Sequence, residues 1–591
     1  MTKKRRLHSL AFAIVWSLTA SSWRAAQSSG SSKSTQSPPT VAAQSLPGTG
    51  DNEPTDLSQT VDRIITRENQ FLKDLVTFSP RVETYIQDFR PDQELGTAPT
   101  DDHYFLGRMD FRQGISVRSF LAEHSWWGHR VLSSLAPNFQ VRYDPGAFAY
   151  PIVIDPHRFD RRHYQFTFVR REFLGDVRCL VFDVQPHPRS GYGLFVGRMW
   201  VEEHRDNVVR FNGTFAPAPR NAWYFHFDSW RENLQPGLWL PVYIYGEETD
   251  VQYSSRHRVQ FKSLTHLWGY GLSKPNHEGE LTRMLVDAPT PVQDVSDDAS
   301  DLSPVSSQRQ WESEAESNVL ERLQKAGLLA PPGEVDKVLE TVVNNLVVTN
   351  HLDNLPQVHC RILLTTPLES LAIGNSIIMS RGLIDVLPDE ASLATMLAHE
   401  LAHVVLGHTL TSADTRYAFD DRLLIPDEAV LQRLNFKPTE AEEAAADAKA
   451  NELLKNSPYK DQLGKAGLFL RALAEAAPHT PQLTGAHLGS RLARGNQVLR
   501  MADLMIGAPE LKQTRLDQVA ALPLGARIKV DAWNDRIALI KSKPVSLVSA
   551  REKMPFEVTP QLPYLTRYGE SQQSANEPNP KEQGATATRR Q

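Results

Sequence analysis

The motif H-E-L-A-H at residues 399–403 restricts this chain more than any other feature of its sequence. It lies in a run with helical spacing, and helix residues advance by about 100° each, so His399 and His403 project from one face, one turn apart. Two imidazoles at that separation can bind one zinc ion, while Glu400 lies on the neighbouring flank, within reach of a water on the metal. The run predicts a helix that carries two metal ligands and a carboxylate.

The residues around the motif favour a metal site over a chance match. Residues 388–390 (P-D-E) indicate a helix start, because acidic side chains are stabilised near the positive end of the helix dipole. Leucine, methionine and valine side chains then make the helix largely apolar, and histidines and a glutamate on a buried helix need polar partners. A third ligand is expected from the alanine-rich, acidic segment 439–447, which is also predicted to be helical.

Three glutamates of that segment are candidates for the third ligand: Glu440, Glu442 and Glu443. On one helix Glu442 projects about 100° and Glu440 about 60° from Glu443, so rotation alone excludes neither. Asp447 lies one turn after Glu443. A solvated acidic helix face explains the segment when it is taken alone, but its combination with the upstream motif favours a ligand.

The combination H-E-L-A-H, followed about forty residues later by E-A-A-A-D, resembles the CAAX prenyl protease and HtpX type of zinc metallopeptidase. Residues 377–384 (I-I-M-S-R-G-L-I) match the strand and the G-L-hydrophobic turn that precede the active helix in that family. The resemblance covers roughly residues 320–505. It implies a mainly α (α+β) domain of the zincin type.

The resemblance also implies a role for each residue of the site. His399, His403 and Glu443 are expected to hold one zinc ion, and Glu400 is expected to activate the water. Asp447 is expected to lie behind these ligands and to orient a ligand histidine. The choice of Glu443 rests on its four-residue spacing to Asp447 in the family pattern.

Further residues near the motif give weaker indications. On a continued helix, His408 points about 180° from His399, so no ligand role is expected for it. The resemblance places strand 376–380 near the cleft, where an extended peptide could pair with it. Arg491 is the candidate for contacts to the transition state, although its H-L-G-S-R context lacks the proline of the family motif.

The first 26 residues predict a secretory signal peptide. A basic cluster at residues 3–6 precedes an apolar stretch at 10–20, which is too short for a bilayer span of about 20 residues. No apolar run of 18 residues follows. The chain is therefore expected to be exported, periplasmic or secreted, and soluble after cleavage, without a transmembrane span. An uncleaved anchor is the alternative.

Composition divides the remainder of the chain into two folded parts, each large enough to bury a core. Segments rich in small polar or acidic residues separate them. The expected order is disordered 27–57, an antiparallel β domain 58–282, an acidic linker 283–318, a metallopeptidase domain 319–510, a C-terminal extension 511–568 and a disordered tail 569–591.

Short alternating strands with turn signals predict an antiparallel meander for residues 58–282. Residues 197–201 (G-R-M-W-V) and 238–244 (L-W-L-P-V-Y-I) resemble the outer-membrane lipoprotein carrier (LolA-like) fold, a half-barrel around an apolar cavity. That resemblance implies a lipid or acyl chain as a partner. A filled core is the alternative, because cavity lining and core use the same residues.

The whole sequence predicts an exported zinc metalloendopeptidase that hydrolyses peptide bonds of envelope or misfolded proteins through a zinc-activated water. A net charge of −6 gives no sign of nucleic-acid binding, and Cys179 and Cys360 lie in different parts, which excludes a disulfide framework. The alternative is a non-enzymatic lipid or lipoprotein carrier with a structural zinc site. Structural zinc sites usually have four protein ligands, and only three are found here.

Overall fold

A computed structural model describes residues 57–92, 96–112, 114–121, 145–216, 225–248, 260–271, 304–408, 438–485, 487–511, 528–531, 536–539, 558 and 563–568. The predicted signal peptide 1–26, nearly all of segment 27–57 and the tail 569–591 lie outside these residues. None of the helices in the described part of the chain combines the length and the apolar character that crossing a bilayer requires.

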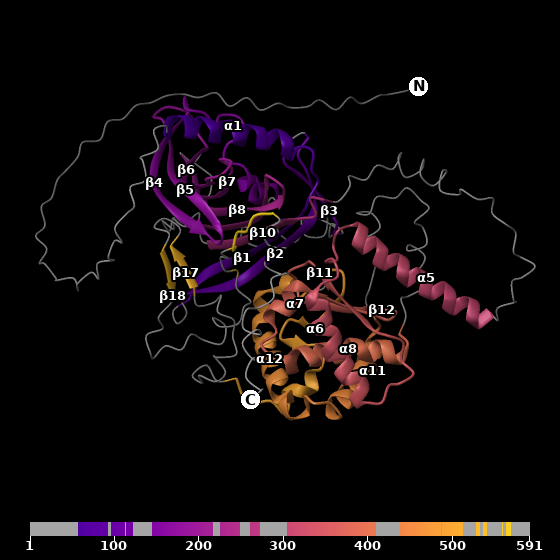
Figure 1. Cartoon of the computed structure of the whole chain (residues 1–591). Helices are drawn as coiled ribbons and strands as arrows, with labels where there is room; N and C mark the ends of the chain where they lie inside the picture. Colours follow the sequence, from indigo (N-terminus) through magenta and orange to yellow (C-terminus); the bar gives the residue numbers. More distant parts are fainter. Residues whose placement is uncertain are drawn as a thin grey trace, which may run out of the picture. The chain divides into compact units, whose positions relative to one another are not determined.

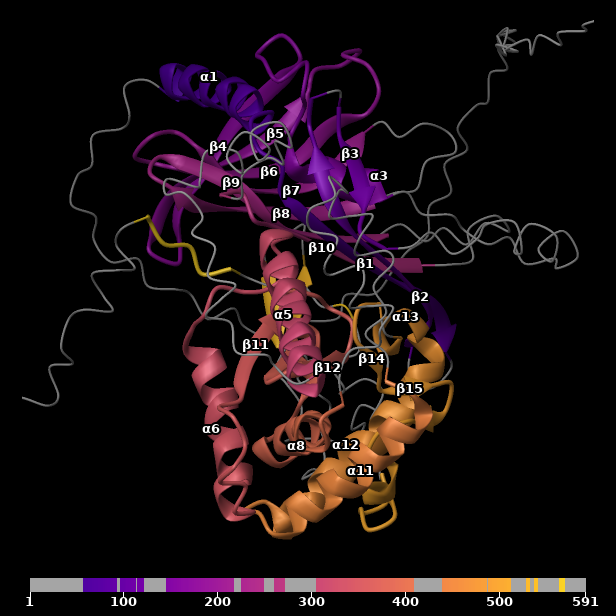
Figure 2. The same cartoon turned by 90° about the vertical axis from the view of Figure 1, so that its right-hand side faces the viewer.

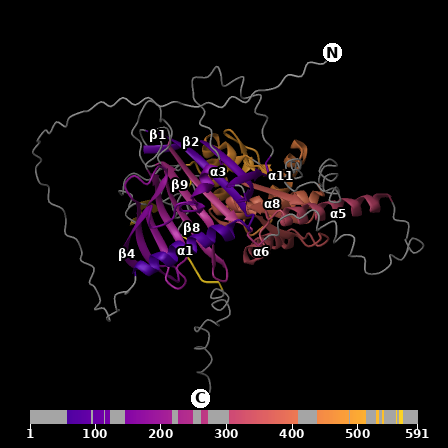
Figure 3. The ribbon, with the colours of Figure 1, turned by 90° about the horizontal axis from the view of Figure 1, so that it is seen from above.

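The first folded part is an open, fully antiparallel sheet. Its strand order is β3-β2-β1-β10-β9-β8-β7-β6-β5-β4, with β1 and β2 at the opposite side of the sheet from β4 (Figure 3). β3 and β4 are the two ends of this order, so the sheet does not close, and the predicted antiparallel half-barrel is confirmed. The strands are β1 (Arg81–Asp92), β2 (Gly96–Asp110), β3 (Ser116–Ser119), β4 (Tyr164–Leu174), β5 (Val177–Pro186), β6 (Leu194–Glu202), β7 (Val208–Ala216), β8 (Phe225–Gln235), β9 (Leu238–Glu248) and β10 (Gln260–Trp268).

Helix α1 (Leu57–Leu75) lies across one face of this sheet (Figure 1). Its buried residues recur at the three- and four-residue spacing that places them on one stripe, and Glu68 lies on that stripe. The Glu68 carboxylate accepts two hydrogen bonds from the Arg231 guanidinium of β8, at 2.6 and 2.7 Å. Both side chains are almost fully buried, so each charge depends on the other.

The sheet face beneath α1 is packed with aromatic side chains. Phe195, Phe211, Phe215 and Phe227 contact one another with ring centroids 5.0 to 6.5 Å apart. These rings belong to the same apolar cluster as the buried face of α1. The sequence alone does not distinguish a cavity lining from a filled core. Beneath α1 these aromatic residues form a filled core.

The second folded part is mainly helical around a small sheet, as predicted. Helices α6, α8, α11 and α12 group beside this sheet (Figure 2). The strand order is β11-β13-β12-β14. The elements are α5 (Pro304–Lys325), α6 (Glu334–Thr349), β11 (His359–Leu363), β12 (Glu369–Ile373), β13 (Ser376–Ser380), α7 (Arg381–Val386), α8 (Glu390–Leu406), α11 (Glu440–Lys455), α12 (Leu463–Ala476), α13 (Pro481–Thr484), β14 (Ser490–Arg491), β15 (Ala493–Arg494) and β16 (Gln497–Val498).

Helix α5 begins at Pro304, inside the segment 283–318 that the sequence predicts to be a linker. Residues 283–303 lie outside the described part of the chain. The acidic residues of this segment predict a linker, but the segment also contains glutamate, glutamine and alanine, which are strong helix formers. The later part of the predicted linker is therefore helical.

Strand β13 lies inside its sheet, so residues 376–380 do not form the edge strand that the predicted pairing with an extended peptide requires. It pairs with β11 in parallel and with β12 in antiparallel register. The tight turn from Ile373 to Ser376 contains Gly374 at a φ of +55°, a conformation that glycine adopts without strain. This turn folds β12 onto one side of β13, and β14 then pairs with the other side of β12 at Glu369 and Ser370.

Buried hydrogen bonds join the large sheet to the helical part. The Glu83 carboxylate of β1, fully buried, accepts from the Thr366 N–H at 2.6 Å and the Thr366 hydroxyl at 2.8 Å, and from Arg381 at 3.2 Å. Asp102 of β2 accepts from the backbone N–H groups of residues 482 and 483 at 2.7 and 2.8 Å. One cluster of buried apolar side chains also includes residues of both parts, such as Trp230 and Leu401.

Candidate metal centre

Helix α8 carries the H-E-L-A-H motif and is fixed at both ends. Its N-cap is Asp389, whose side chain accepts a hydrogen bond from the Ser392 N–H at 2.8 Å, within the helix start predicted at residues 388–390. Its C-cap is Gly407, with a left-handed φ of 68°. Between these caps the helix is buried on almost every side, and the three motif side chains are at most 2% exposed.

Helix α11 supplies the carboxylates opposite α8. Thr439 and Glu442 form a capping box, in which the Glu442 carboxylate accepts from the Thr439 N–H at 2.7 Å. This contact occupies Glu442 at the helix start, and Glu440 is exposed. Glu443 is the glutamate of this turn that lies against His399. Helix rotation alone did not distinguish the three glutamates. In the structure Glu442 is bonded at the helix cap and Glu440 is exposed, which leaves Glu443 beside His399.

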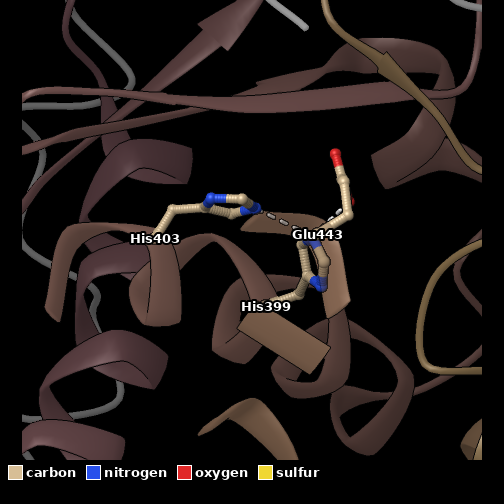
Figure 4. Close-up of side chains that lie close together, drawn as sticks. All are labelled: His399, His403 and Glu443. Atoms are coloured by element: carbon tan, nitrogen blue, oxygen red, sulfur yellow. Dashed lines mark hydrogen bonds and ion pairs between the residues drawn. The ribbon is translucent and has the colours of Figure 1, made fainter. Parts of the chain in front are cut away.

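The structure brings together His399, His403 and Glu443, whose side chains converge (Figure 4). The His399 Nε2 atom lies 3.2 Å from His403 Nε2 and 3.1 Å from Glu443 Oε2, and the three ligand atoms all lie within 4.8 Å of one another. Tetrahedral ligands at about 2.0–2.1 Å from zinc lie about 3.3 Å apart. The spacing of the three side chains therefore fits one small metal ion.

Asp447 fixes the orientation of His399. Its Oδ1 atom lies 2.7 Å from His399 Nδ1, and both carboxylate oxygens accept from the Met501 N–H at 3.0 Å. An imidazole that donates its Nδ1–H to a carboxylate keeps the Nε2 lone pair for a metal. Asp447 thus lies where the family resemblance places a residue that orients a ligand histidine.

The position of His408 differs from the prediction. Its Nδ1 atom lies 2.8 Å from Nδ1 of His403, whereas a continued helix would point it away from the site. The reason is that α8 ends at Leu406 and the left-handed Gly407 turns the chain back toward the preceding turn. His408 is not one of the three clustered residues, but its contact can fix the tautomer of His403.

Arg500 is a site residue that the sequence analysis missed. Its Nη1 atom lies 2.6 Å from Glu400 Oε1, while Nε and Nη2 each lie 3.2 Å from a Glu443 oxygen. The predicted candidate, Arg491, lies in β14, in register with Glu369. No motif marks Arg500; the one signal in the sequence is a cation inside an apolar run, V-L-R-M, which needs acidic partners when buried.

The electrostatics of the cluster favour the protonation states that a metal requires. Burial opposes ionisation of Glu443, but Arg500 and His399 outweigh it and hold the pKa of Glu443 well below its usual value. Burial lowers the pKa of His403 to about 4. Burial and Arg500 also lower the pKa of His399, but Asp447 and Glu443 outweigh them and raise it above 6.5. In the metal-free protein at neutral pH, Glu443 is thus ionised and His403 neutral.

Zinc affinity is expected to fall as the pH is lowered from 7.5 to 5. Metal binding requires neutral imidazoles, and in this range His399, with its raised pKa, is the histidine that gains a proton. Loss of one proton for each ion bound means that affinity falls about tenfold per pH unit below the His399 pKa. Chelator competition at several pH values measures this slope.

A matched variant makes the pH test specific. Asp447→Asn removes the carboxylate that raises the pKa of His399, so its zinc affinity should begin to fall at a lower pH than that of the wild type. A wild-type affinity that does not change between pH 7.5 and 5 contradicts the assignment of His399 as a ligand.

A comparison with protein-family models finds one match, which lies at the metal centre. The model of peptidase family M48 matches residues 370–420, which contain β13, α7 and α8 with its H-E-L-A-H motif. A comparison with curated proteins finds no match.

Solved structures that match part of the chain include a LolA superfamily protein of Nitrosomonas europaea, at 12% identity, and a DUF1329 family protein of Desulfovibrio piger, at 11%. They cover 37% and 38% of this chain and 96% and 98% of their own, each with a TM-score of 0.18. Neither indicates what the sheet of this chain binds. The metallopeptidase resemblance of the sequence is confirmed over residues 370–420, as a match to peptidase family M48.

Proposed function

We propose that this chain is a zinc-dependent metalloendopeptidase. The observation that supports the proposal most is the convergence of His399, His403 and Glu443 beside Glu400, which comes from α8 but is not one of the three clustered ligands. Two imidazoles and one carboxylate form a ligand set found in catalytic zinc sites, where the fourth position is left for water or substrate. A carboxylate next to such a set has a use in hydrolysis that a structural site does not require.

Each residue of the site has a separate role in the proposed hydrolysis of a peptide bond. Bound zinc would supply Lewis acidity, which lowers the pKa of a coordinated water to about 7 and polarises the scissile carbonyl. Glu400 accepts the proton of the attacking water and then donates it to the leaving amine nitrogen. Asp447 and His408 hold the two ligand imidazoles in orientation. Ser370 donates a hydrogen bond to Glu400 at 2.6 Å and so restricts its carboxylate.

The substrate is proposed to be a protein or peptide. Export rests on residues 1–26, and a preference for envelope or misfolded proteins rests on the combination of the carrier-like sheet with a protease. Both stay predictions. Binding of a lipid or acyl chain by the sheet also stays a prediction. The alternative, a carrier with a structural zinc site, has less support for two reasons. The described residues supply three ligands, which leaves a coordination position for water, and Glu400 is buried beside them.

Chelation of the full-length protein tests the proposed function. The zinc-loaded chain is expected to hydrolyse casein or a quenched peptide library, to lose this activity with 1,10-phenanthroline and to regain it when Zn²⁺ but not Mg²⁺ is added, because imidazole ligands suit zinc. The non-chelating isomer 1,7-phenanthroline is the matched control. A chain that holds one zinc ion per molecule yet hydrolyses nothing in either assay contradicts the proposal and supports the carrier.

A further inference from the structure

Arg500 contacts two carboxylates with different roles in the proposed reaction. Its guanidinium is 2% exposed and lies between Glu400, the proposed general base, and Glu443, the proposed metal ligand. We propose that Arg500 is a positioning residue for peptide hydrolysis, which ties the general base to the third metal ligand and fixes the orientation of both. This inference rests on the proposed function and adds a residue to it.

The geometry of the guanidinium suits this role. Nε and Nη2 lie 3.2 Å from Glu443 Oε2 and Oε1, a two-pronged contact that sets the plane of the ligand carboxylate. Nη1 points to Glu400 Oε1 at 2.6 Å. A guanidinium holds its donors in a rigid planar fork, so turning toward one carboxylate would move the other contact. An ammonium group is a compact point charge and cannot span both.

Ser370 closes the arrangement around Glu400. Its hydroxyl donates to Glu400 Oε1 at 2.6 Å and accepts from Arg500 Nη1 at 2.8 Å. Ser370 itself belongs to β12, whose backbone is paired on both sides. Ser370 and Arg500 both contact Oε1 of the Glu400 carboxylate, so Oε2 is the oxygen that accepts the proton of the water.

The backbone around Arg500 is anchored independently of its ion pairs. The Leu499 N–H donates to the Leu492 carbonyl at 2.8 Å, and the Met501 N–H donates to Asp447. Met501 has a φ of 54°, a left-handed conformation that is costly for a residue with a side chain. The Asp447 carboxylate that orients His399 therefore also holds the turn that delivers Arg500 to the site.

Kinetics of Arg500→Ala, Arg500→Lys and Ser370→Ala in the full-length protein test the proposal. Arg500→Ala is expected to lower kcat about a hundredfold while KM changes by less than about threefold, because a misplaced catalytic group can cost that much without affecting substrate binding. Arg500→Lys is expected to behave like the alanine variant. Guanidinium ion at millimolar concentration should restore part of kcat to Arg500→Ala, whereas the same concentration of KCl should not. Ser370→Ala is expected to lower kcat about tenfold.

A second readout does not depend on activity. Cobalt(II) replaces zinc in such sites and absorbs visible light according to its ligands. The visible bands of the Co²⁺-loaded protein should change in Arg500→Ala, because the Glu443 carboxylate is released from its two-pronged contact. They should stay the same in Ser370→Ala, whose hydroxyl contacts Glu400 and Arg500 but not a ligand.

Several results overturn the inference. It fails if Arg500→Ala keeps kcat within about threefold of the wild type at equal metal content, or if this variant is faster, which would make the contact inhibitory. If Arg500→Ala does not fold, unchanged kcat in both Arg500→Lys and Ser370→Ala overturns it. A wild type without chelator-sensitive hydrolysis contradicts the proposed function instead, and the Co²⁺ bands then decide alone whether Arg500 orients Glu443.

Discussion

Replacing Glu400 with glutamine is expected to reduce kcat for peptide hydrolysis by about a thousandfold or more while zinc stays bound. General acid–base catalysis contributes about 10²- to 10⁴-fold, and the amide that replaces the carboxylate cannot accept the proton of the water. Zinc stays bound because Glu400 is not among the three converging ligands. The measurements are zinc content after gel filtration and steady-state hydrolysis of the same peptide.

The glutamine substitution has a matched control on the neighbouring helix. Glu440→Gln makes the same chemical change at an exposed position of α11 and should leave both zinc content and kcat unchanged. A Glu400→Gln protein that cleaves the peptide at the wild-type rate would show that another group is the base.

Replacing Glu443 with alanine is expected to remove zinc and with it all measurable hydrolysis. Loss of a residue that only orients a ligand typically costs 10- to 100-fold in metal affinity, so loss of one of three ligands should exceed about a hundredfold. The same change at Glu442 should leave zinc bound, because that carboxylate is occupied at the start of α11 by Thr439. Glu442→Ala should lower the free energy of unfolding by about 1 kcal/mol, as the loss of other helix caps does.

Zinc content after dialysis against a weak chelator compares the two alanine variants. The assignment is wrong if Glu443→Ala keeps its zinc and Glu440→Ala or Glu442→Ala loses it. Thermal unfolding of metal-free Glu443→Ala, compared with metal-free wild type, separates a lost ligand from a damaged fold.

The sequence predicts those parts of the fold that local periodicity determines. Alternating residues in β4 to β9 and the helical spacing of the H-E-L-A-H run identify strands and a helix without knowledge of their neighbours. The place of β13 inside its sheet depends on which strands pair with it, and these are β11 on one side and β12 on the other. Alternation within residues 376–380 contains no information about which strands lie on either side of them.

Local patterns also explain which residues of the site were predicted, and long-range contacts explain which were missed. His399 and His403 face one another because four residues make about one helical turn, which the sequence shows directly. Arg500 reaches Glu400 and Glu443 only because the turn at Met501 is held by Asp447, a long-range contact. The error at His408 had a local signal, since Gly407 is a typical residue for the end of a helix.

The buried contacts between the large sheet and the helical part link metal binding to the folding of the sheet. Glu83 and Asp102 of the sheet accept hydrogen bonds from backbone N–H groups of the helical part. One apolar cluster contains both Trp230 of β8 and Leu401 of α8. A ligand that binds only the native state stabilises every segment that unfolds together with its site. Zinc bound at α8 should thus raise the melting temperature reported by the tryptophans of the sheet, and withdrawing the ion should leave the sheet more open to proteolysis.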